Sequence, residues 1–367
     1  TFWVGSLFIK ASHFFIPETE WKRKKFTDKG GLQMLELLLP LNIVLIIIIL
    51  LVSLFLLSKS ADFLVDNAVK LSKIIKIPEM VIGATIVSFG TTLPEFSAST
   101  ISALRGNFGF ALGNEIGSII TNTSLVLGVG ALFGAIPVTR KASQKLSILN
   151  IVVLLLILPT IPRVLRNGEG TIPQWMGVVL LVLVPFYVLF LIAQEKRSPE
   201  IEISDPEEAE SHSNLFLTAL LVLGAAAFVA FCASVLVASA EIIAMRIGIS
   251  DILISATIVA FGTSVPELTT AVSAAKTGHG GLAIGNVMGA NILNILWVTG
   301  ASIAVIPGGI TVPNSFYLVH FPAMIAVLAI FGYFAYNKNR NEINHKEGIL
   351  LTGIFGIYLL ANVIFTL

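Results

Sequence analysis

Two glutamates of this chain stand where glutamates are costly, each directly after a proline inside a long apolar segment. Glu95 follows Pro94, and Glu267 follows Pro266. A carboxylate at membrane depth is rare and is by default the mark of a functional site. Two such carboxylates, together with hydroxyl and carbonyl oxygens, are ligands that suit calcium and sodium. We therefore interpret the pair as part of a cation site.

Hydroxyl residues lie about one helical turn before each glutamate; they are Thr91, Thr92, Thr263 and Ser264. The two prolines should break their helices, because proline has no N–H to donate and its ring clashes with the preceding turn. Carbonyl groups freed in hydrocarbon are tolerated only where they line a cavity or bind something. The local ligands are all oxygen, without sulfur or imidazole, so a zinc or iron site is not expected.

Both glutamates belong to an internal repeat. Residues 83–128 align with residues 255–300 without a gap, and 20 of the 46 pairs are identical. Each unit holds about five apolar stretches, and because five is odd the second unit enters the membrane upside down relative to the first. Inverted repeats are typical of secondary transporters, whose site lies at the midplane on broken helices. Duplication for packing alone would explain the repeated glycines but not the repeated glutamates.

The composition indicates an integral membrane protein. The chain is 55% hydrophobic and 12% charged, with mean hydropathy +0.90, whereas soluble domains carry about 25% charged residues. The net charge of +1 argues against a nucleic-acid partner, and the single cysteine, Cys232, excludes an intrachain disulfide. The histidines show no metal-ligand spacing, and no Ser-His or paired-Asp arrangement suggests an enzyme.

Ten apolar stretches are long enough to span about 30 Å of hydrocarbon. They cover residues 34–58, 78–104, 109–134, 146–162, 172–193, 215–245, 251–276, 281–306, 315–336 and 347–366. We therefore predict an all-α membrane protein of two inverted five-helix repeats, with helices two and seven broken. The predicted units are an N-terminal segment of unclear status (1–33), a first repeat (34–194), an acidic linker (195–214) and a second repeat (215–367).

The distribution of Lys and Arg predicts the orientation. Loops after odd-numbered stretches hold thirteen of them and loops after even-numbered stretches hold four, which predicts that the linker is cytoplasmic and both termini are outside. Lys22 to Lys25 and Lys29 disagree with this assignment. The first residues lack an initiator Met and are interpreted as the remnant of a longer or processed N-terminus. A linker too short for a large regulatory domain favours a prokaryotic cell membrane.

The doubled motif resembles the alpha repeats of the cation/calcium exchanger superfamily, in particular its sodium/calcium exchanger branch and prokaryotic members. The motif reads Gly-Thr-Thr-Leu-Pro-Glu in one copy and Gly-Thr-Ser-Val-Pro-Glu in the other, each followed by Gly-Asn-x-x-Gly-[Ser/Ala]. The resemblance covers nearly the whole chain from about residue 34. It implies ten transmembrane helices and calcium antiport driven by sodium entry, with the lipid bilayer as surroundings and no bound cofactor.

The resemblance also implies a ligand set. Calcium would be bound by Glu95, Glu267, Thr91 and Thr263, and sodium also by Ser88, Ser118, Asn122, Asn294 and the carbonyl of Ala260. Thr92 and Ser264 would support them. The sequence also singles out Pro94, Pro266, Asn114, Asn286 and Glu115 as supporting residues. Ala290 replaces a serine of archaeal relatives, and some relatives have Asp where this chain has Asn294, so the sodium stoichiometry stays open.

Glu115 has two interpretations at this point. Its repeat counterpart is Val287, so it is an additional carboxylate. Because it shares a helical stripe with Ser118 and Asn122, it could extend the ion path or couple a proton; alternatively, it lies at headgroup level near the start of its helix.

Two other functions remain open. A calcium/proton antiporter on the same fold would protonate the glutamates in the return step. A cation channel with acidic selectivity residues is the other, although broken helices in an inverted repeat favour alternating access over an open pore.

Overall fold

The computed structural model describes residues 37–104, 106, 108–138, 140–161, 170–196, 215–247, 260–336 and 342–366. The helices of the first half are α4 (Ile43–Ile75), α5 (Glu79–Ile82), η1 (Gly83–Val87), α6 (Ser88–Thr91), α7 (Leu93–Leu104), α8 (Phe108–Thr121), η2 (Asn122–Val126), α9 (Leu127–Phe133), α10 (Arg140–Ile157), η3 (Leu158–Thr160) and α12 (Gln174–Lys196). Those of the second half are α13 (Leu215–Arg246), α15 (Ala260–Thr263), α16 (Val265–Lys276), α17 (Gly280–Leu293), η6 (Asn294–Thr299), α18 (Gly300–Ala304), η7 (Phe316–His320), α19 (Phe321–Tyr336) and α20 (His345–Thr366). The segments η1, η2, η6 and η7 are π-helical, and η3 is a 3-10 turn. The predicted all-helical class is confirmed.

Six helical runs are long and apolar enough to cross a membrane: Ile43–Ile75, Phe108–Phe133, Gln174–Ala193, Leu215–Leu236, Gly280–Ala304 and Phe316–Ala335. Two shorter apolar runs, Glu79–Thr91 and Gln144–Thr160, fall in the second and fourth predicted spans. Helix α20 coincides with the tenth span, and α16 lies in the seventh, part of which is outside the described residues. The protein is a multi-pass membrane protein, and the count of ten helices stays a prediction.

The first predicted span has the wrong bounds. Helix α4 begins at Ile43, where the side chain of Asn42 accepts a hydrogen bond from the N–H of Leu45. It then continues to Ile75, well beyond the predicted end at residue 58, and stops where Lys76 takes a left-handed conformation (φ 55°). The extension is amphipathic, since it buries one apolar stripe that includes Leu64 and Val65. Mean hydropathy drops across such a segment while its helical period persists.

Four short strands, which the sequence analysis did not predict, join loops that are distant in sequence. Strand β1 (Ile136–Pro137) pairs antiparallel with β4 (Glu342–Ile343), and β2 (Gly170–Ile172) pairs with β3 (Ile310–Val312). The first pair connects the loops after the third and ninth predicted spans, and the second pair connects those after the fourth and eighth. Each pair joins loops that the Lys and Arg counts place on one side of the membrane.

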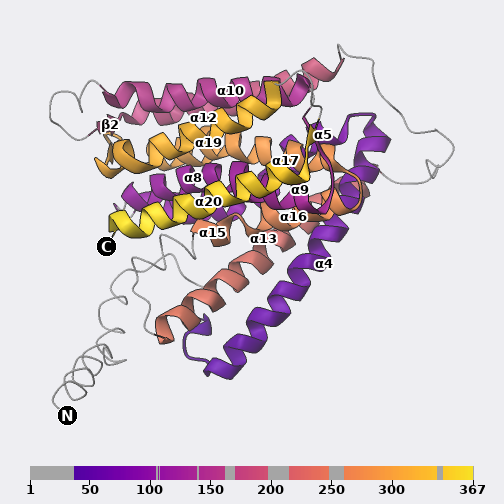
Figure 1. The fold of residues 1–367 in the computed structure, drawn as a ribbon, viewed down its shortest axis with the longest axis horizontal. Coiled ribbons are helices and arrows are strands. Elements are labelled where there is room, and N and C mark those ends of the chain that lie inside the picture. The colour runs from indigo at the N-terminus through magenta and orange to yellow at the C-terminus, as the bar shows by residue number, and fades with distance from the viewer. Residues whose placement is uncertain are drawn as a thin grey trace.

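The helices divide into a bundle and a protruding pair (Figure 1). Helices α10, α12, α19 and α20 run in similar directions in this view, whereas α4 and α13 pack along each other and diverge from the bundle. The pair exposes large apolar side chains, such as Phe55 on α4 (62%) and Phe216 on α13 (75%). These surfaces fit contact with lipid, since exposed apolar area of this extent is unusual in soluble proteins.

The centre of the molecule is formed by the repeated motif. Of the six apolar runs, Phe108–Phe133 and Gly280–Ala304 are buried over 78% and 89% of their most apolar windows, against 22% to 39% for the other four. Helix α17 packs against α5, η1 and α6 of the opposite half. The interior therefore consists of one half's motif inserted against the other's, and the remaining helices surround it.

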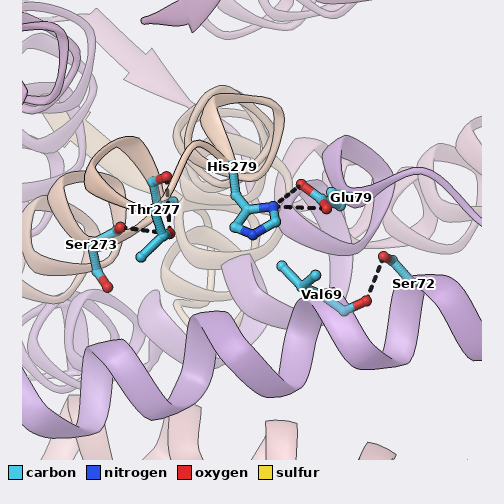
Figure 2. Close-up of polar contacts among 7 residues, drawn as sticks. Val69, Ser72, Glu79, Ser273, Thr277 and His279 are labelled. Atoms are coloured by element: carbon cyan, nitrogen blue, oxygen red, sulfur yellow. Dashed lines mark hydrogen bonds and ion pairs between the residues drawn. The ribbon is translucent and has the colours of Figure 1, made fainter. Parts of the chain in front are cut away.

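A polar contact also ties the two halves at one end of the molecule. His279, just before α17, has Nδ1 2.9 Å from both carboxylate oxygens of Glu79 in α5 (Figure 2). Nearby, the hydroxyl of Ser273 on α16 donates to Asp62 on α4 over 2.7 Å. Both contacts join segments next to the loops after the first and seventh predicted spans, which the prediction also places on one side.

Candidate cation-binding site

Both motif helices break at one residue, immediately before the proline. Helix α6 ends at Thr91, and Thr92 (φ −82°, ψ 0°) separates it from α7; helix α15 ends at Thr263, and Ser264 (φ −87°, ψ 4°) separates it from α16. Proline is tolerated in a first turn, where its missing N–H is not needed, so the predicted breaks are confirmed. Because Pro94 and Pro266 have no N–H, neither residue donates a hydrogen bond to a carbonyl of the preceding turn, as expected from the sequence.

Each glutamate therefore lies in the first turn of a new helix. Glu95 belongs to the first turn of α7 and Glu267 to that of α16. A helix N-terminus carries a partial positive charge that stabilises a carboxylate. This local field offsets part of the cost of burying the two charges.

The two glutamates are fully buried, at 0% exposure, and none of their four carboxylate oxygens has a hydrogen-bond partner. The two carboxylates lie within electrostatic range of each other. Ser118 lies beside Glu95, while Thr91 and Thr92 of the first half lie beside Glu267 of the second. Glu267, which belongs to the second half, therefore shares its surroundings with hydroxyls of the first half.

Further polar atoms of the repeated motif are buried without a hydrogen-bond partner. They are the hydroxyl oxygens of Thr92, Ser118 and Ser264 and both amide atoms of Asn122 and Asn294. Leaving a buried polar group unpaired costs about 1–3 kcal/mol, so these unpaired atoms are unfavourable without a ligand. Carboxylate, hydroxyl and amide oxygens are the ligands of hard cations. The donor set fits calcium and sodium.

The supporting asparagines connect the halves in a symmetric way. Thr91 donates to Oδ1 of Asn286 over 3.3 Å, and Thr263 donates to Oδ1 of Asn114 over 3.2 Å. Ser88 adds a hydrogen bond of 2.9 Å to the backbone carbonyl of Asn286. Each threonine is thereby oriented by an asparagine of the opposite half.

Comparison with known proteins agrees with this geometry. The family model described as "Sodium/calcium exchanger protein" matches residues 45–193 and again residues 217–364. The chain belongs to the sodium/calcium exchanger family. It is 35% identical over 321 residues to the putative antiporter CaxA of Alkalimonas amylolytica, covering 86% of this chain and 98% of that protein. It is 28% identical over 368 residues to the sodium/calcium exchanger MaX1 of Methanosarcina acetivorans, covering 86% and 97%.

The fold of this family member also matches a solved exchanger. The structure of the sodium-calcium exchanger NCX_Mj soaked with sodium and strontium superposes with TM-score 0.70 and 28% identity, covering 87% of this chain and 99% of that one. The family assignment from the doubled motif is thus confirmed, as is the helical membrane fold.

Two π-helical segments of the exchanger begin at the paired asparagines, a feature that sequence reasoning missed. Segment η2 starts at Asn122 and η6 starts at Asn294, its repeat counterpart. In η6, the hydroxyl of Thr299 donates to the carbonyl of Asn294 over 2.8 Å. A π-turn leaves carbonyls less regularly paired and is frequent at functional sites. The repeat itself was the available signal, since both asparagines recur at matching positions.

Close packing around the exchanger's site depends on glycines of α17. A Cβ on Gly285 would lie 2.3 Å from the carbonyl oxygen of Met80, and one on Gly289 would lie 2.4 Å from the hydroxyl of Ser88. Any side chain at these positions would push α17 away from α5 and α6. The small residues therefore allow the backbones to approach closely enough for the Asn286 contacts.

Of the remaining predicted site residues, Ala260 opens α15, and its side chain is outside the described part. Glu115 is 1% exposed within α8, so its side chain is buried inside the protein, and both interpretations of its role stay predictions. Its Oε1 accepts hydrogen bonds from Ser99 and from Asn114. It is linked to Thr263 through Asn114, whose Oδ1 accepts a hydrogen bond from the hydroxyl of Thr263.

Proposed function

We propose that this chain is a secondary active antiporter that exchanges calcium for sodium by alternating access. The observation that carries the proposal is the pair of buried glutamates whose four oxygens have no hydrogen-bond partner, each at the start of a helix broken at proline. Calcium would bind Glu95 and Glu267 with Thr91 and Thr263. Sodium ions would use the same residues together with Ser88, Ser118, Asn122, Asn294 and the carbonyl of Ala260.

Electrostatics explains why such a site exchanges ions. Two ionised carboxylates in a low-dielectric interior repel each other strongly, so a site without cations is unfavourable and the protein does not easily change sides in that state. One calcium ion balances the two negative charges. Three sodium ions would leave one excess positive charge, so exchange of that stoichiometry moves net charge across the membrane.

The proposed setting is a prokaryotic cell membrane, with both termini outside and the linker 195–214 in the cytoplasm. The excess of Lys and Arg after odd-numbered spans supports this orientation. The strand pairs β1–β4 and β2–β3 agree with its alternation of sides.

Radioactive calcium uptake into proteoliposomes tests the proposal. Vesicles loaded with sodium are diluted into sodium-free buffer, and a parallel set carries a proton gradient instead. Uptake that requires the outward sodium gradient and is lost in Glu95→Gln supports sodium/calcium exchange. Glu342→Gln makes the same chemical change at an exposed residue and should transport normally. Uptake with the proton gradient alone would instead establish calcium/proton antiport, and calcium flux without a counter-ion gradient would indicate a channel.

A further inference from the structure

Glu115 forms a second polar centre between α7 and α8, outside the ligand set described above. The hydroxyl of Ser99 on α7 donates to Oε1 of Glu115 on α8. The side-chain N–H of Asn114 donates to Ser99 over 2.9 Å and reaches Oε1 of Glu115 at 3.5 Å. Ser99 is 0% and Glu115 1% exposed, yet Oε2 of Glu115 has no partner. The centre is therefore a buried, half-satisfied carboxylate.

The internal repeat shows that this centre is not required by the fold. The repeat counterparts of Ser99 and Glu115 are Ala271 and Val287, both 0% exposed. The second half thus fills the equivalent place with an apolar pair and keeps its helices packed. A carboxylate and its hydroxyl donor occur together in one half and are absent together in the other. This joint occurrence argues for a role beyond packing.

Neither Lys nor Arg lies on the described elements that pack most extensively against the helix of Glu115. Those elements are α7, α15, α17, α19, β3, η2, η6 and η7. Their described residues include Glu95 and His320 but neither Lys nor Arg, and His320 contacts Tyr358 at 3.2 Å. A buried carboxylate with a free oxygen and no cationic partner is strongly unfavourable in its charged form unless it acquires a counter-ion, and it is otherwise neutralised by a proton.

The centre is hydrogen-bonded to the main site through Asn114. Asn114, which donates to Ser99, also accepts the hydrogen bond from Thr263, one of the proposed calcium ligands. Ser99 is four residues from Glu95 and Glu115 is three from Ser118, so each pair shares a helix face at about 5–6 Å. Glu115 also lies within electrostatic range of Glu95. No three acidic, His or Cys side chains of the described residues converge on one metal position, so Glu115 stands beside the main site and not in it.

We propose that Glu115, with the oxygen of Ser99, forms an accessory sodium subsite next to Thr263. One carboxylate balances one monovalent cation, whereas calcium takes six to eight oxygens and usually several carboxylates. With the predicted orientation, Ser99 lies on the outer side of Glu95, so the subsite is on the outer path to the main site. In the second half, Ala290 stands at the position of Ser118 and has no hydroxyl. The subsite supplies the oxygens of Glu115 and Ser99 next to Thr263 of that half. The proposal rests on the proposed exchange function.

The test compares wild type with Glu115→Gln and Ser99→Ala, and uses Glu342→Gln as the matched control. Sodium-driven calcium release from proteoliposomes is measured over a sodium series, and calcium/calcium exchange is measured over a calcium series without sodium. Loss of a ligand or its hydrogen-bond partner typically costs about 10–100-fold in metal affinity. We expect the half-saturating sodium concentration to rise about 10-fold in Glu115→Gln, and less in Ser99→Ala, while the half-saturating calcium concentration shifts much less.

Direct sodium binding separates this proposal from the exchange function. Sodium, compared with choline, should raise the melting temperature of purified wild type, and part of that rise should be lost in both variants but kept in Glu342→Gln. Equal sodium responses in all four proteins would overturn the subsite even if wild type exchanges normally. An equal loss of the calcium and sodium responses would place Glu115 in the main site, and a changed proton dependence with unchanged sodium dependence would make it a proton site; either result overturns the proposal. A wild type that binds sodium at Glu115 without exchanging ions would refute the exchange function alone.

Discussion

Glu95 and Glu267 combine full burial with unpaired oxygens, and this combination is a cost to stability. Each sits at a helix N-terminus, which offsets part of the repulsion between them. Neighbouring hydroxyls are close, but none completes a hydrogen bond with them. The surroundings are therefore arranged for a ligand that contributes positive charge.

Replacing either glutamate with glutamine should abolish exchange without unfolding the protein. Glu95→Gln and Glu267→Gln remove one charged ligand each, so we expect sodium-driven calcium uptake to fall by about 100-fold or more, beyond the 10–100-fold typical of outer ligand partners. The ion-free variants should melt at the same or a higher temperature than wild type, because carboxylate repulsion is relieved.

Calcium should accordingly stabilise only the wild type. At a calcium concentration 100 times the dissociation constant, binding contributes about 2.7 kcal/mol to the free energy of unfolding. Thermal melting with and without calcium measures this difference. Retained calcium transport in either variant would contradict the site assignment.

Asn294 offers a test of how charge in the site sets ion selectivity. It is 1% exposed, begins η6 and has both amide atoms unpaired. Asn294→Asp adds a negative charge at nearly constant volume, and a change of about 1.4 kcal/mol in ion binding corresponds to a tenfold shift in affinity. We expect the half-saturating sodium concentration, or the response to potassium, to shift by about that factor. Asn42→Asp, at an exposed helix cap, is the control. If Asn294→Asp and wild type depend on sodium and potassium in the same way, position 294 does not affect ion binding.

At the scale of elements, the broken helices determine where the glutamates point. The breaks at Thr92 and Ser264 let each glutamate begin a new helix, and the π-helical segments η2 and η6 place Asn122 and Asn294 at their starts. Interrupted helices at the middle of a membrane protein are tolerated where their backbone lines a site. The interruption is thus part of the site.

Pro94→Ala should join α6 to α7 and slow transport. Alanine restores an N–H that can donate to the carbonyl of Gly90 and so favours one continuous helix. Because proline is already tolerated in a first turn, we expect little change in stability but slower turnover. Melting temperatures and initial exchange rates measure the two effects. Pro185→Ala removes a proline within α12 at an exposed position and serves as the control. Wild-type rates in Pro94→Ala would mean that the break is dispensable.

At the scale of the whole molecule, the two halves depend on each other. Each motif threonine is oriented by an asparagine of the opposite half, and His279 contacts Glu79 across the halves (Figure 2). Neither half contains a complete site alone. Relative movement of the halves would therefore change the ligands of both glutamates at once, which is what alternating access requires.

The inverted arrangement predicts the side of each loop. The test uses a Cys232→Ala background, which removes the native free cysteine. In this background, Ser198→Cys in the linker should react with impermeant maleimide only from the cytoplasmic side. Asn107→Cys should react only from outside. Labelling of intact cells and of inverted vesicles measures this. Both cysteines reacting from the same side would exclude the predicted topology.

The sequence by itself determined the membrane class, the repeat, the helix breaks and the two glutamates. These follow from composition, from self-alignment and from the chemistry of proline and buried carboxylates, all of which act locally along the chain. Local signals were insufficient in two places. Hydropathy predicted an end of the first span at residue 58, although α4 continues to Ile75 as an amphipathic helix. The sequence also could not choose between the two interpretations of Glu115.

Only the tertiary structure decided which residues of one half touch those of the other. The Thr91–Asn286 and Thr263–Asn114 contacts, the strand pairs between loops, and the joining of Ser99 to Glu115 span long sequence separations. Such contacts depend on how helices pack, and packing is set by the shapes of many side chains together, such as the glycines that admit α17 against α5 and α6.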